Sequence, residues 1–328
     1  MQILSHRFRP ALTAVWAALL GAVAPHAAAQ SFPIKNIVMV VPYTAGGSAD
    51  LFSRVMAQKL GEMWGRNVVV ENRPGASGMI GTELVTKADP DGHTLLGHTS
   101  SYPATASVRA KLPFDPARAI VPVAMTARAP MLIAVHPSVP AKNVKELIAV
   151  AKKTKGGLNY GSSGTGGNNH FSGSLFAAAA GIDMTHVPFK GISLAVTALA
   201  AGEIEVLISS QAALMPQIQA NRVRILAVTS AKPSPLFPEL RPAAEGGAPG
   251  YSYELWWGVF APAGLTAERI AFINAAANKI LGTEDMKKLI ASQGAEPWPL
   301  TPKELDGLLI REIDRYRKAA KIAGIKPQ

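Results

Sequence analysis

The chain has 328 residues, with 33 lysines and arginines against 22 aspartates and glutamates, and a formal net charge of +11. It contains no cysteine, which excludes a disulfide framework, a thiolate metal site and a lipid anchor attached to cysteine. The basic residues are scattered and are not interleaved with aromatic residues, so nucleic-acid binding is not expected. A positive surface instead favours small anions, acidic partners or an acidic membrane surface.

The first 29 residues have the pattern of a secretory signal. A basic start at residues 6–9 precedes an apolar run over residues 11–24, and residues 27–29 are small alanines suited to cleavage. The apolar run is short for a membrane span, which needs about 20 residues, so an uncleaved anchor is the weaker alternative. Cleavage near Ala29 would remove two arginines and no acid, and would leave an exported, periplasmic chain with a net charge of +9.

Strands and helices alternate in the rest of the chain. Residues 37–41 form a continuous apolar run, as expected for a strand buried on both faces of a parallel sheet. A helix follows over residues 51–63, with apolar side chains at helical spacing. The later elements of this half are a strand at 68–70, a turn at 72–78 with a helix after it, and a strand around 95–96. This βαβαβ order is one half of an open α/β sheet.

A second set of alternating elements begins after residues 131–135. Its expected helices contain residues 144–151, 171–176, 194–201 and 212–220, and its expected strands contain residues 158–160, 186–188, 204–208 and 224–228. The tail adds a strand at 256–261 and two helices over 270–281 and 305–316, which is too little strand for a third domain.

We therefore predict two α/β lobes joined by two crossover strands that act as a hinge. The predicted boundaries are a signal peptide at 1–29, a first lobe at 30–133 and 259–328, and a second lobe at 134–258. The cleft between the lobes is expected at the carboxyl ends of the strands.

A glycine-rich loop follows the first strand, over residues 42–50. A helix start offers free backbone N–H groups and about half a positive charge, so such a loop can hold an anion. Ser48 is expected to cap the helix, and Gly46 and Gly47 before it favour a ligand over an ordinary turn. Asp50 falls in the first helical turn, where it either stabilises the helix start or faces the cleft and accepts a hydrogen bond from a ligand.

A second glycine-rich loop, residues 161–167, also follows a strand and opens a helix. Four glycines alternate there with Ser162, Ser163 and Thr165, which supplies hydroxyls and closely approachable amides. The loop has neither the Gly-Lys-Ser/Thr of a P-loop nor the spacing of a dinucleotide site. His170 is expected to cap the helix, to pack or to reach the ligand. Lys190, after a later strand, either attracts an anion at the cleft mouth or is a solvated turn residue.

Signals for catalysis are weak in this sequence. No Gly-x-Ser-x-Gly nucleophile elbow occurs, and the histidines lack metal-ligand spacing. We expect no catalytic residue, no metal and no cofactor. The alternative is an exported hydrolase that acts on a carboxylated or phosphorylated substrate through a serine of the second loop.

Taken together, these stretches resemble the Bug family, the periplasmic solute receptors of tripartite tricarboxylate transporters. The matching segments keep the family's order and cover nearly the whole chain after the signal: residues 42–50, 70–78, 90–96, 160–166, 186–191, 226–230 and 261–264. The resemblance implies a two-lobed Venus-flytrap fold that closes on a small carboxylated metabolite. Each lobe would be an open, mostly parallel sheet with flanking helices.

The resemblance also implies ligand contacts, mostly through loop backbone, from both lobes. Carried over by matching position, they are Tyr43, Ala45, Gly46, Gly47 and Asp50 from the first lobe and Ser163, Gly164, Thr165, Gly166 and His170 from the second. We add Ser48, then Thr99 and Ser100 past a strand end, and Ser209 at the end of a second-lobe strand. The stretch from Ser209 to Gln211 is neutral, where family members often have an acidic or aromatic residue.

The resemblance also indicates the partners. The solute would be an organic acid, an amino acid or an aromatic acid, and a monomeric receptor is expected to pass it to membrane transporter subunits. A receptor that serves only a sensor kinase is the other possibility, which the sequence does not separate from transport.

Overall fold

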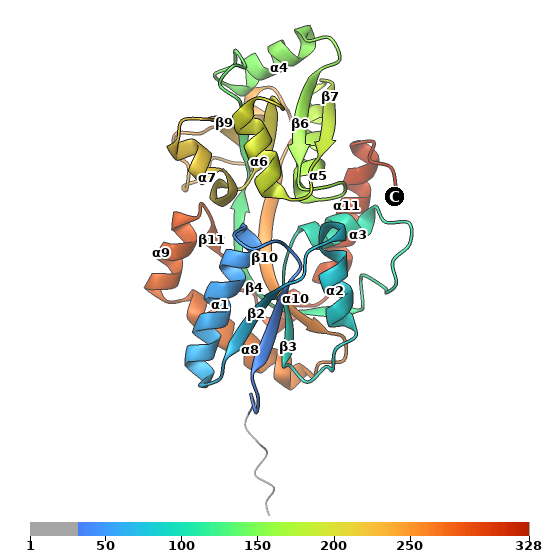
Figure 1. Cartoon of the computed structure of the whole chain (residues 1–328), viewed down its shortest axis with the longest axis vertical. Helices are drawn as coiled ribbons and strands as arrows, with labels where there is room; N and C mark the ends of the chain where they lie inside the picture. Colours follow the sequence, from blue (N-terminus) through green and yellow to red (C-terminus); the bar gives the residue numbers. More distant parts are fainter. Residues whose placement is uncertain (1–31, 328) are drawn as a thin grey trace, which may run out of the picture. The chain divides into compact units, whose positions relative to one another are not determined.

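The computed structural model describes residues 32–327, so the signal peptide predicted at residues 1–29 lies outside the described residues. Lys35–Gln328 is one compact unit, in which strands and helices alternate (Figure 1). The strands are β1 (Ile37–Val41), β2 (Val68–Asn72), β3 (Thr94–Thr99), β4 (Ile120–Pro130), β5 (Leu132–Val135), β6 (Leu158–Ser162), β7 (Met184–Pro188), β8 (Val206–Ser209), β9 (Arg224–Val228), β10 (Glu254–Pro262) and β11 (Glu296–Pro297).

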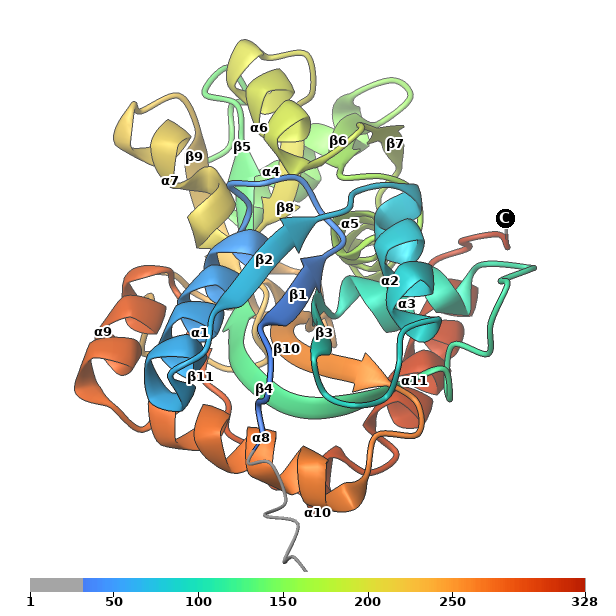
Figure 2. The same ribbon diagram turned by 60° about the horizontal axis from the view of Figure 1, so that its bottom comes forward.

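The helices cover both sides of these strands. They are α1 (Ser48–Trp64), α2 (Met79–Thr86), α3 (Ser101–Ser107), α4 (Val144–Lys153), α5 (Asn168–Ala180), α6 (Ile192–Ala201), α7 (Gln211–Gln219), α8 (Ala267–Leu281), α9 (Glu284–Ser292), α10 (Pro302–Leu305) and α11 (Leu308–Ile322), with short 3₁₀ turns η1 (Ala76–Gly78) and η2 (Ala243–Gly246). In Figure 2, α1 and α8 lie on one side of the first sheet and α2, α3 and α11 on the other.

The strands form two separate sheets. The first has the order β11-β4-β10-β3-β1-β2, and the second has the order β7-β6-β8-β5-β9. Strands β1 to β4 run in one direction in the first sheet, and β10 and β11 run the other way. In the second sheet only β5 opposes its neighbours. The predicted two-lobed α/β fold is confirmed, but both sheets are mixed rather than mostly parallel, because the pairs that β5, β10 and β11 make with their neighbours are antiparallel.

The chain changes sheet at two places that lie side by side. Only Met131 separates β4 of the first sheet from β5 of the second. The Met131 amide donates to Thr229 Oγ1 at 2.7 Å, and the Thr229 hydroxyl donates to the carbonyl of Tyr253, just before β10, at 2.6 Å. Thr229 thus ties the two crossing segments together. The lobe boundaries at 133/134 and 258/259 stay predictions.

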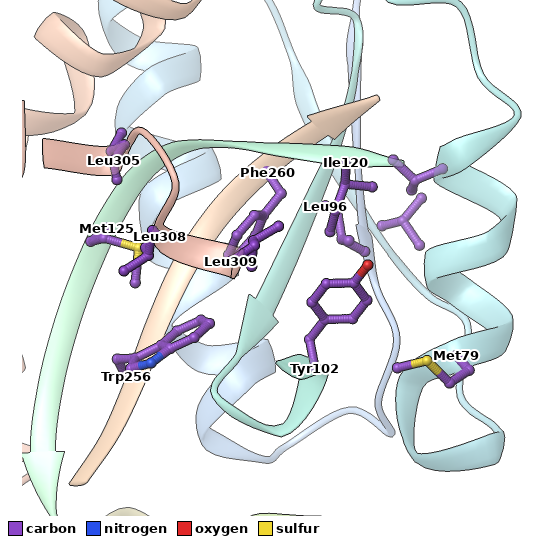
Figure 3. Close-up of a cluster of buried hydrophobic side chains, with 12 residues drawn as sticks. Met79, Leu96, Tyr102, Ile120, Met125, Trp256, Phe260, Leu305, Leu308 and Leu309 are labelled. Atoms are coloured by element: carbon purple, nitrogen blue, oxygen red, sulfur yellow. The ribbon is translucent and has the colours of Figure 1, made fainter. Parts of the chain in front are cut away.

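Each sheet packs its own hydrophobic core. In the first core, the buried side chains of Leu96, Tyr102, Trp256, Phe260 and Leu309 bring β3, α3, β10 and α11 together (Figure 3). The second core lies around β5, β8 and α6 and includes Leu132, Ala195, Leu199, Leu207 and Val228. The C-terminal helix therefore belongs to the first core, as the sequence predicts for a tail that returns to the first lobe.

The start of α1 differs from the sequence-based expectation. Its N-cap is Gly47 in an extended conformation, and within the described residues no side chain caps it. Ser48 is the first helical residue, and its hydroxyl accepts a hydrogen bond from Trp257 Nε1 at 3.2 Å. The prediction that Ser48 caps the helix is wrong, because its side chain is held by the β10 indole instead. The amides at the start of α1 therefore have no side-chain competitor.

Among residues 32–327, no helix has both the length and the hydrophobicity that a bilayer-spanning segment requires.

Candidate functional site

A cavity of about 590 Å³ lies between the two sheets, within the range of roughly 300–1,000 Å³ that is typical of small-molecule sites. Its lining comes mainly from loops at strand ends and from helix starts. The lining residues are Pro42, Tyr43, Thr44, Gly47, Ser48, Ala49, Pro74, Gly75, Ala76, Ser77, Gly78, Thr99, Ser101, Met131, Ser163, Gly164, Gly167, Asn168, Asn169, Phe189, Lys190, Gly191, Ile192, Ser209, Ser210, Ala213, Leu255 and Trp257.

Several helices begin at this cavity. The first residues of α1, α3, α5 and α6 belong to its lining, and so do the N-cap residues of α2 and α7, Gly78 and Ser210. In the described structure, the starts of α1, α5 and α6 carry no side-chain cap. A helix start offers backbone N–H groups and about half a positive charge, so together these helix starts favour a negatively charged guest.

The formal charges around the cavity agree with that preference. Lys190 is the only charged side chain among the described residues that line it, and those residues include no aspartate or glutamate. Lys190 is exposed, and within residues 32–327 it forms no salt bridge. A cation without a neighbouring carboxylate attracts an anion to the cavity mouth.

The first glycine loop is held by the buried carboxylate of Asp50. This carboxylate accepts hydrogen bonds from the Gly46 amide at 3.0 Å and from Arg54 Nε at 3.0 Å. Asn72 Nδ2 donates to it as well, at 2.9 Å. Burial alone would raise the pKa of Asp50, but the hydrogen bonds from Arg54, Gly46 and Asn72 outweigh it and lower the pKa. The carboxylate is therefore ionised and occupied by its own loop.

Behind the first loop, neutral polar side chains form the cavity wall. Tyr43 Oη lies 3.2 Å from His98 Nδ1 and 3.4 Å from Thr99 Oγ1. Burial raises the pKa of Tyr43 to about 12 and lowers the pKa of His98 to about 3, so both are neutral at pH 7. The Thr99 amide donates to His98 Nδ1 at 2.8 Å, which puts the imidazole proton on Nε2. This wall offers hydroxyls and no formal charge.

The second glycine loop is held by two stacked histidines. His170 Nδ1 accepts from the Gly166 amide at 3.0 Å, and His186 Nε2 lies 2.6 Å from Ser162 Oγ. The two imidazoles stack with centroids 3.9 Å apart. Burial lowers the pKa of each to about 4, and for His186 the neighbouring His170 adds to the effect. Neutral histidines thus fix both ends of the loop.

The lobes approach each other at the rim of the cavity. Ser77 Oγ lies 3.4 Å from the Thr165 carbonyl oxygen, so it can donate to the second loop. Ala76 and Ser77 have φ angles of 47° and 55°, in the left-handed region that non-glycine residues seldom adopt. Such strain persists where the surrounding structure imposes it, and it is often found at functional sites.

The predicted contact residues divide into two groups. Those that line the cavity are Tyr43, Gly47, Ser48, Thr99, Ser163, Gly164 and Ser209. The others are absent from the described lining: Ala45, Gly46, Asp50, Ser100, Thr165, Gly166 and His170. As ligand contacts, all of them stay predictions.

The structure adds lining residues that the sequence analysis missed. The turn from Pro74 to Gly78 forms one wall, and its glycine-rich sequence is a signal that could have indicated it. Met131, Leu255 and Trp257 form an apolar wall on the crossing strands. Hydrophobic residues of this kind give no local signal, because the hinge position that brings them to the cavity is set by tertiary structure.

The serines of the second loop are poorly arranged for nucleophilic catalysis. Ser163 lines the cavity, but its hydroxyl donates to Asn169 Oδ1 at 3.1 Å, and an amide oxygen is not a general base. Ser162 has a histidine partner but is fully buried and is not part of the described lining. In the described part of the chain, no cluster of three or more histidines, cysteines, aspartates or glutamates is placed to hold a metal.

Comparison with known proteins identifies the family. The family model described as "Tripartite tricarboxylate transporter family receptor" matches residues 52–324. Protein BugT of Bordetella pertussis is 32% identical over 318 residues, which cover 96% of this chain and 97% of BugT.

Two solved structures agree in fold and sequence. An R. palustris protein with adipate is 35% identical, with a TM-score of 0.86, and the match covers 90% of this chain and 100% of that protein. MatC from Rhodopseudomonas palustris with bound malate is 28% identical, with a TM-score of 0.80, and covers 88% of this chain and 99% of MatC. The chain therefore belongs to the receptor family of tripartite tricarboxylate transporters, the Bug family indicated by its sequence motifs.

Proposed function

We propose that this protein is a periplasmic receptor that binds a small organic acid in the cavity between its sheets and delivers it to membrane transporter subunits. The observation that carries the proposal is the convergence of several helix starts, among them those of α1, α5 and α6, on a cavity whose described lining includes one lysine and no acid. A hydrogen bond to a charged group contributes roughly 1.5–3 kcal/mol. Four or five such bonds suffice for micromolar affinity, which requires about 8 kcal/mol.

The neighbours support the chemical class of the guest. Adipate and malate, which two similar structures contain, are both dicarboxylates. The cavity has a polar side at the glycine loops and an apolar side at Met131, Leu255 and Trp257. We propose a small carboxylate with a hydrocarbon body, anchored by one carboxylate at the helix starts of α1 and α5. Binding without catalysis is part of this proposal, as is export by a signal peptide cleaved near Ala29.

A carboxylate panel tests the proposal. Purified mature protein, residues 30–328, is mixed with adipate, malate, aromatic monocarboxylates and the neutral diamide of adipate. At least one carboxylate should raise the melting temperature and reduce the radius of gyration in X-ray scattering, whereas the diamide should do neither. Stabilisation by the diamide alone, or by no carboxylate, would reject an organic-acid receptor.

A hydrolase that uses Ser163, the second-loop serine in the cavity lining, is the second candidate. Turnover of a bound carboxylate ester or phosphate ester, lost in Ser163→Ala while binding persists, would favour it. An unchanged ligand recovered after prolonged incubation with the protein would favour the receptor.

A further inference from the structure

Asn168 lies at the first position of α5, in the cavity lining, and is surrounded by residues from several parts of the chain. Ser100 Oγ donates to Asn168 Oδ1 at 3.1 Å, and Tyr253 Oη donates to the same oxygen at 2.9 Å. The backbone amide of Asn168 lies 3.4 Å from Ser101 Oγ. Tyr253 also lies 3.0 Å from Tyr316 Oη, on the C-terminal helix.

The orientation of the carboxamide decides what it offers to a guest. An asparagine side chain has one acceptor oxygen and one nitrogen with two donor hydrogens. In the structure Oδ1 faces the hydroxyls of Ser100 and Tyr253, which leaves Nδ2 at the other end of the group. Within residues 32–327, Asn168 Nδ2 has no hydrogen-bond partner.

The neighbouring asparagine provides the contrast. Asn169 also lines the cavity, but its Nδ2 donates to the Ile208 carbonyl at 2.7 Å and its Oδ1 accepts from Ser163 Oγ. Its side chain therefore has both ends occupied by protein. Of these two adjacent residues, only Asn168 has an Nδ2 without a protein partner among the described residues, and it sits at a helix start, where an anion is favoured.

We propose that Asn168 is a ligand-binding residue whose Nδ2 donates to an acceptor oxygen of the guest. The inference rests on the proposed function for the identity of that oxygen, a carboxylate. Ser100 and Tyr253 act as positioning residues, since they hold Oδ1 and so aim the nitrogen. Ser100 follows β3 of the first lobe and Asn168 begins a helix of the second, so the guest would bind directly to a group that links the lobes.

Substitutions of Asn168 and of its partner Tyr253 should weaken ligand binding to different extents. Asn168→Ala removes the donor and should weaken adipate or malate binding about 10- to 100-fold, as expected for a hydrogen bond to a charged group. Asn168→Asp keeps the shape and the acceptor for Ser100 and Tyr253 but faces the guest with a carboxylate, so it should bind still more weakly at pH 7.5. Tyr253→Phe should have a smaller effect, on the order of 3- to 10-fold, because one of two positioning hydroxyls is left.

The pH profile separates direct contact from structural damage. Calorimetric titrations of the wild type and Asn168→Asp with adipate and malate are compared at pH 7.5 and pH 5.0. Protonation of the new aspartate restores a donor, so the ratio of the two dissociation constants should shrink at the lower pH. The ligand's own titration cancels in that ratio. Asn67→Ala, at an exposed asparagine outside the lining, is the matched control and should bind like the wild type.

The outcomes distinguish this inference from the proposed function. If the wild type binds adipate or malate and Asn168→Ala binds it with the same affinity, Asn168 is not a ligand-binding residue. The proposal of an organic-acid receptor then still stands. An Asn168→Asp defect of equal size at both pH values also overturns it, since that pattern reflects damage to the fold. If the wild type binds only the neutral diamide, the organic-acid proposal fails, and loss of diamide binding in Asn168→Ala still supports the contact.

Discussion

The two glycine loops occupy matching positions in the two lobes but are held in different ways. In the first loop Thr44, Ala45 and Gly46 are exposed, and a carbon added at Gly46 would meet nothing within 4 Å. In the second loop Gly166 and Gly167 are buried. The ionised carboxylate of Asp50 holds the first loop by a hydrogen bond, and the neutral imidazoles of His170 and His186 hold the second. We conclude that the second loop is a rigid half of the site and the first an adaptable one.

The largest expected effect comes from adding a methyl group to each loop. Gly166 has φ 79°, and a carbon there would approach Val108 Cγ2 to 2.8 Å. Gly166→Ala should therefore cost about 1–2 kcal/mol of backbone strain plus roughly 1–3 kcal/mol of overpacking. Gly46 has φ 85° and open space around it, so Gly46→Ala should cost only the strain. Urea unfolding measures both, and equal losses would show that the loops do not differ in packing.

Acidification should destabilise the protein through its buried histidines, His98 behind the first loop and His170 and His186 at the second, before it affects Asp50. The pKa of His170 and of His186 is lowered to about 4 in the folded protein, against about 6.5 when unfolded. A proton is then bound more tightly by the unfolded chain, so stability is full above about pH 6.5 and falls as the pH approaches 4. The pKa of Asp50 is lowered from 3.8, so its contribution is kept at pH 5 and lost only in stronger acid.

Urea unfolding at pH 7 and pH 5 checks this difference. The free energy of unfolding should decrease over that interval in the wild type, and less steeply in His170→Asn, which no longer takes up the proton. Asp50→Asn should be destabilised by a similar amount at both values. A wild-type stability that rises between pH 7 and pH 5 would contradict the assignment of neutral, buried histidines.

The smallest expected effect is a change in hydrogen exchange on ligand binding. Amides of the exposed first loop, near residues 44–46, should exchange quickly in the free protein and slow when a carboxylate binds. Amides of the second loop, such as that of Gly166, are already hydrogen-bonded and should change little. Mass spectrometry of peptic fragments with and without adipate measures both segments. Protection confined to the second loop would reverse the roles of the two halves.

Much of the fold could be predicted from local sequence. Apolar runs such as β1 and the glycine loops mark strand ends and helix starts wherever they occur. Strand β4 was missed, because Pro122 interrupts its pattern and proline disfavours a central strand. The structure accommodates Pro122 opposite Phe260, where the register between β10 and β4 shifts. This register shift involves β10, which is far from β4 in the sequence, so the residues around Pro122 alone do not predict it.

The candidate site could be predicted only in part, for a related reason. Loops rich in glycine and serine can be found by composition, which led to Gly47, Ser163 and Gly164 in the lining. The free nitrogen of Asn168 depends on hydroxyls 68 and 85 residues away in the chain. Trp257 reaches the cavity only because β10 crosses between the sheets. Such residues are set by tertiary contacts that no short window of sequence contains.

The most direct test of the central claim is a crystal structure of the protein with adipate or malate. We predict that a carboxylate group lies against the amides at the start of α1 and of α5, between the two glycine loops, with Asn168 Nδ2 within hydrogen-bonding distance. A ligand bound elsewhere, or one held in this cavity with its carboxylates turned away from both helix starts, would contradict the account.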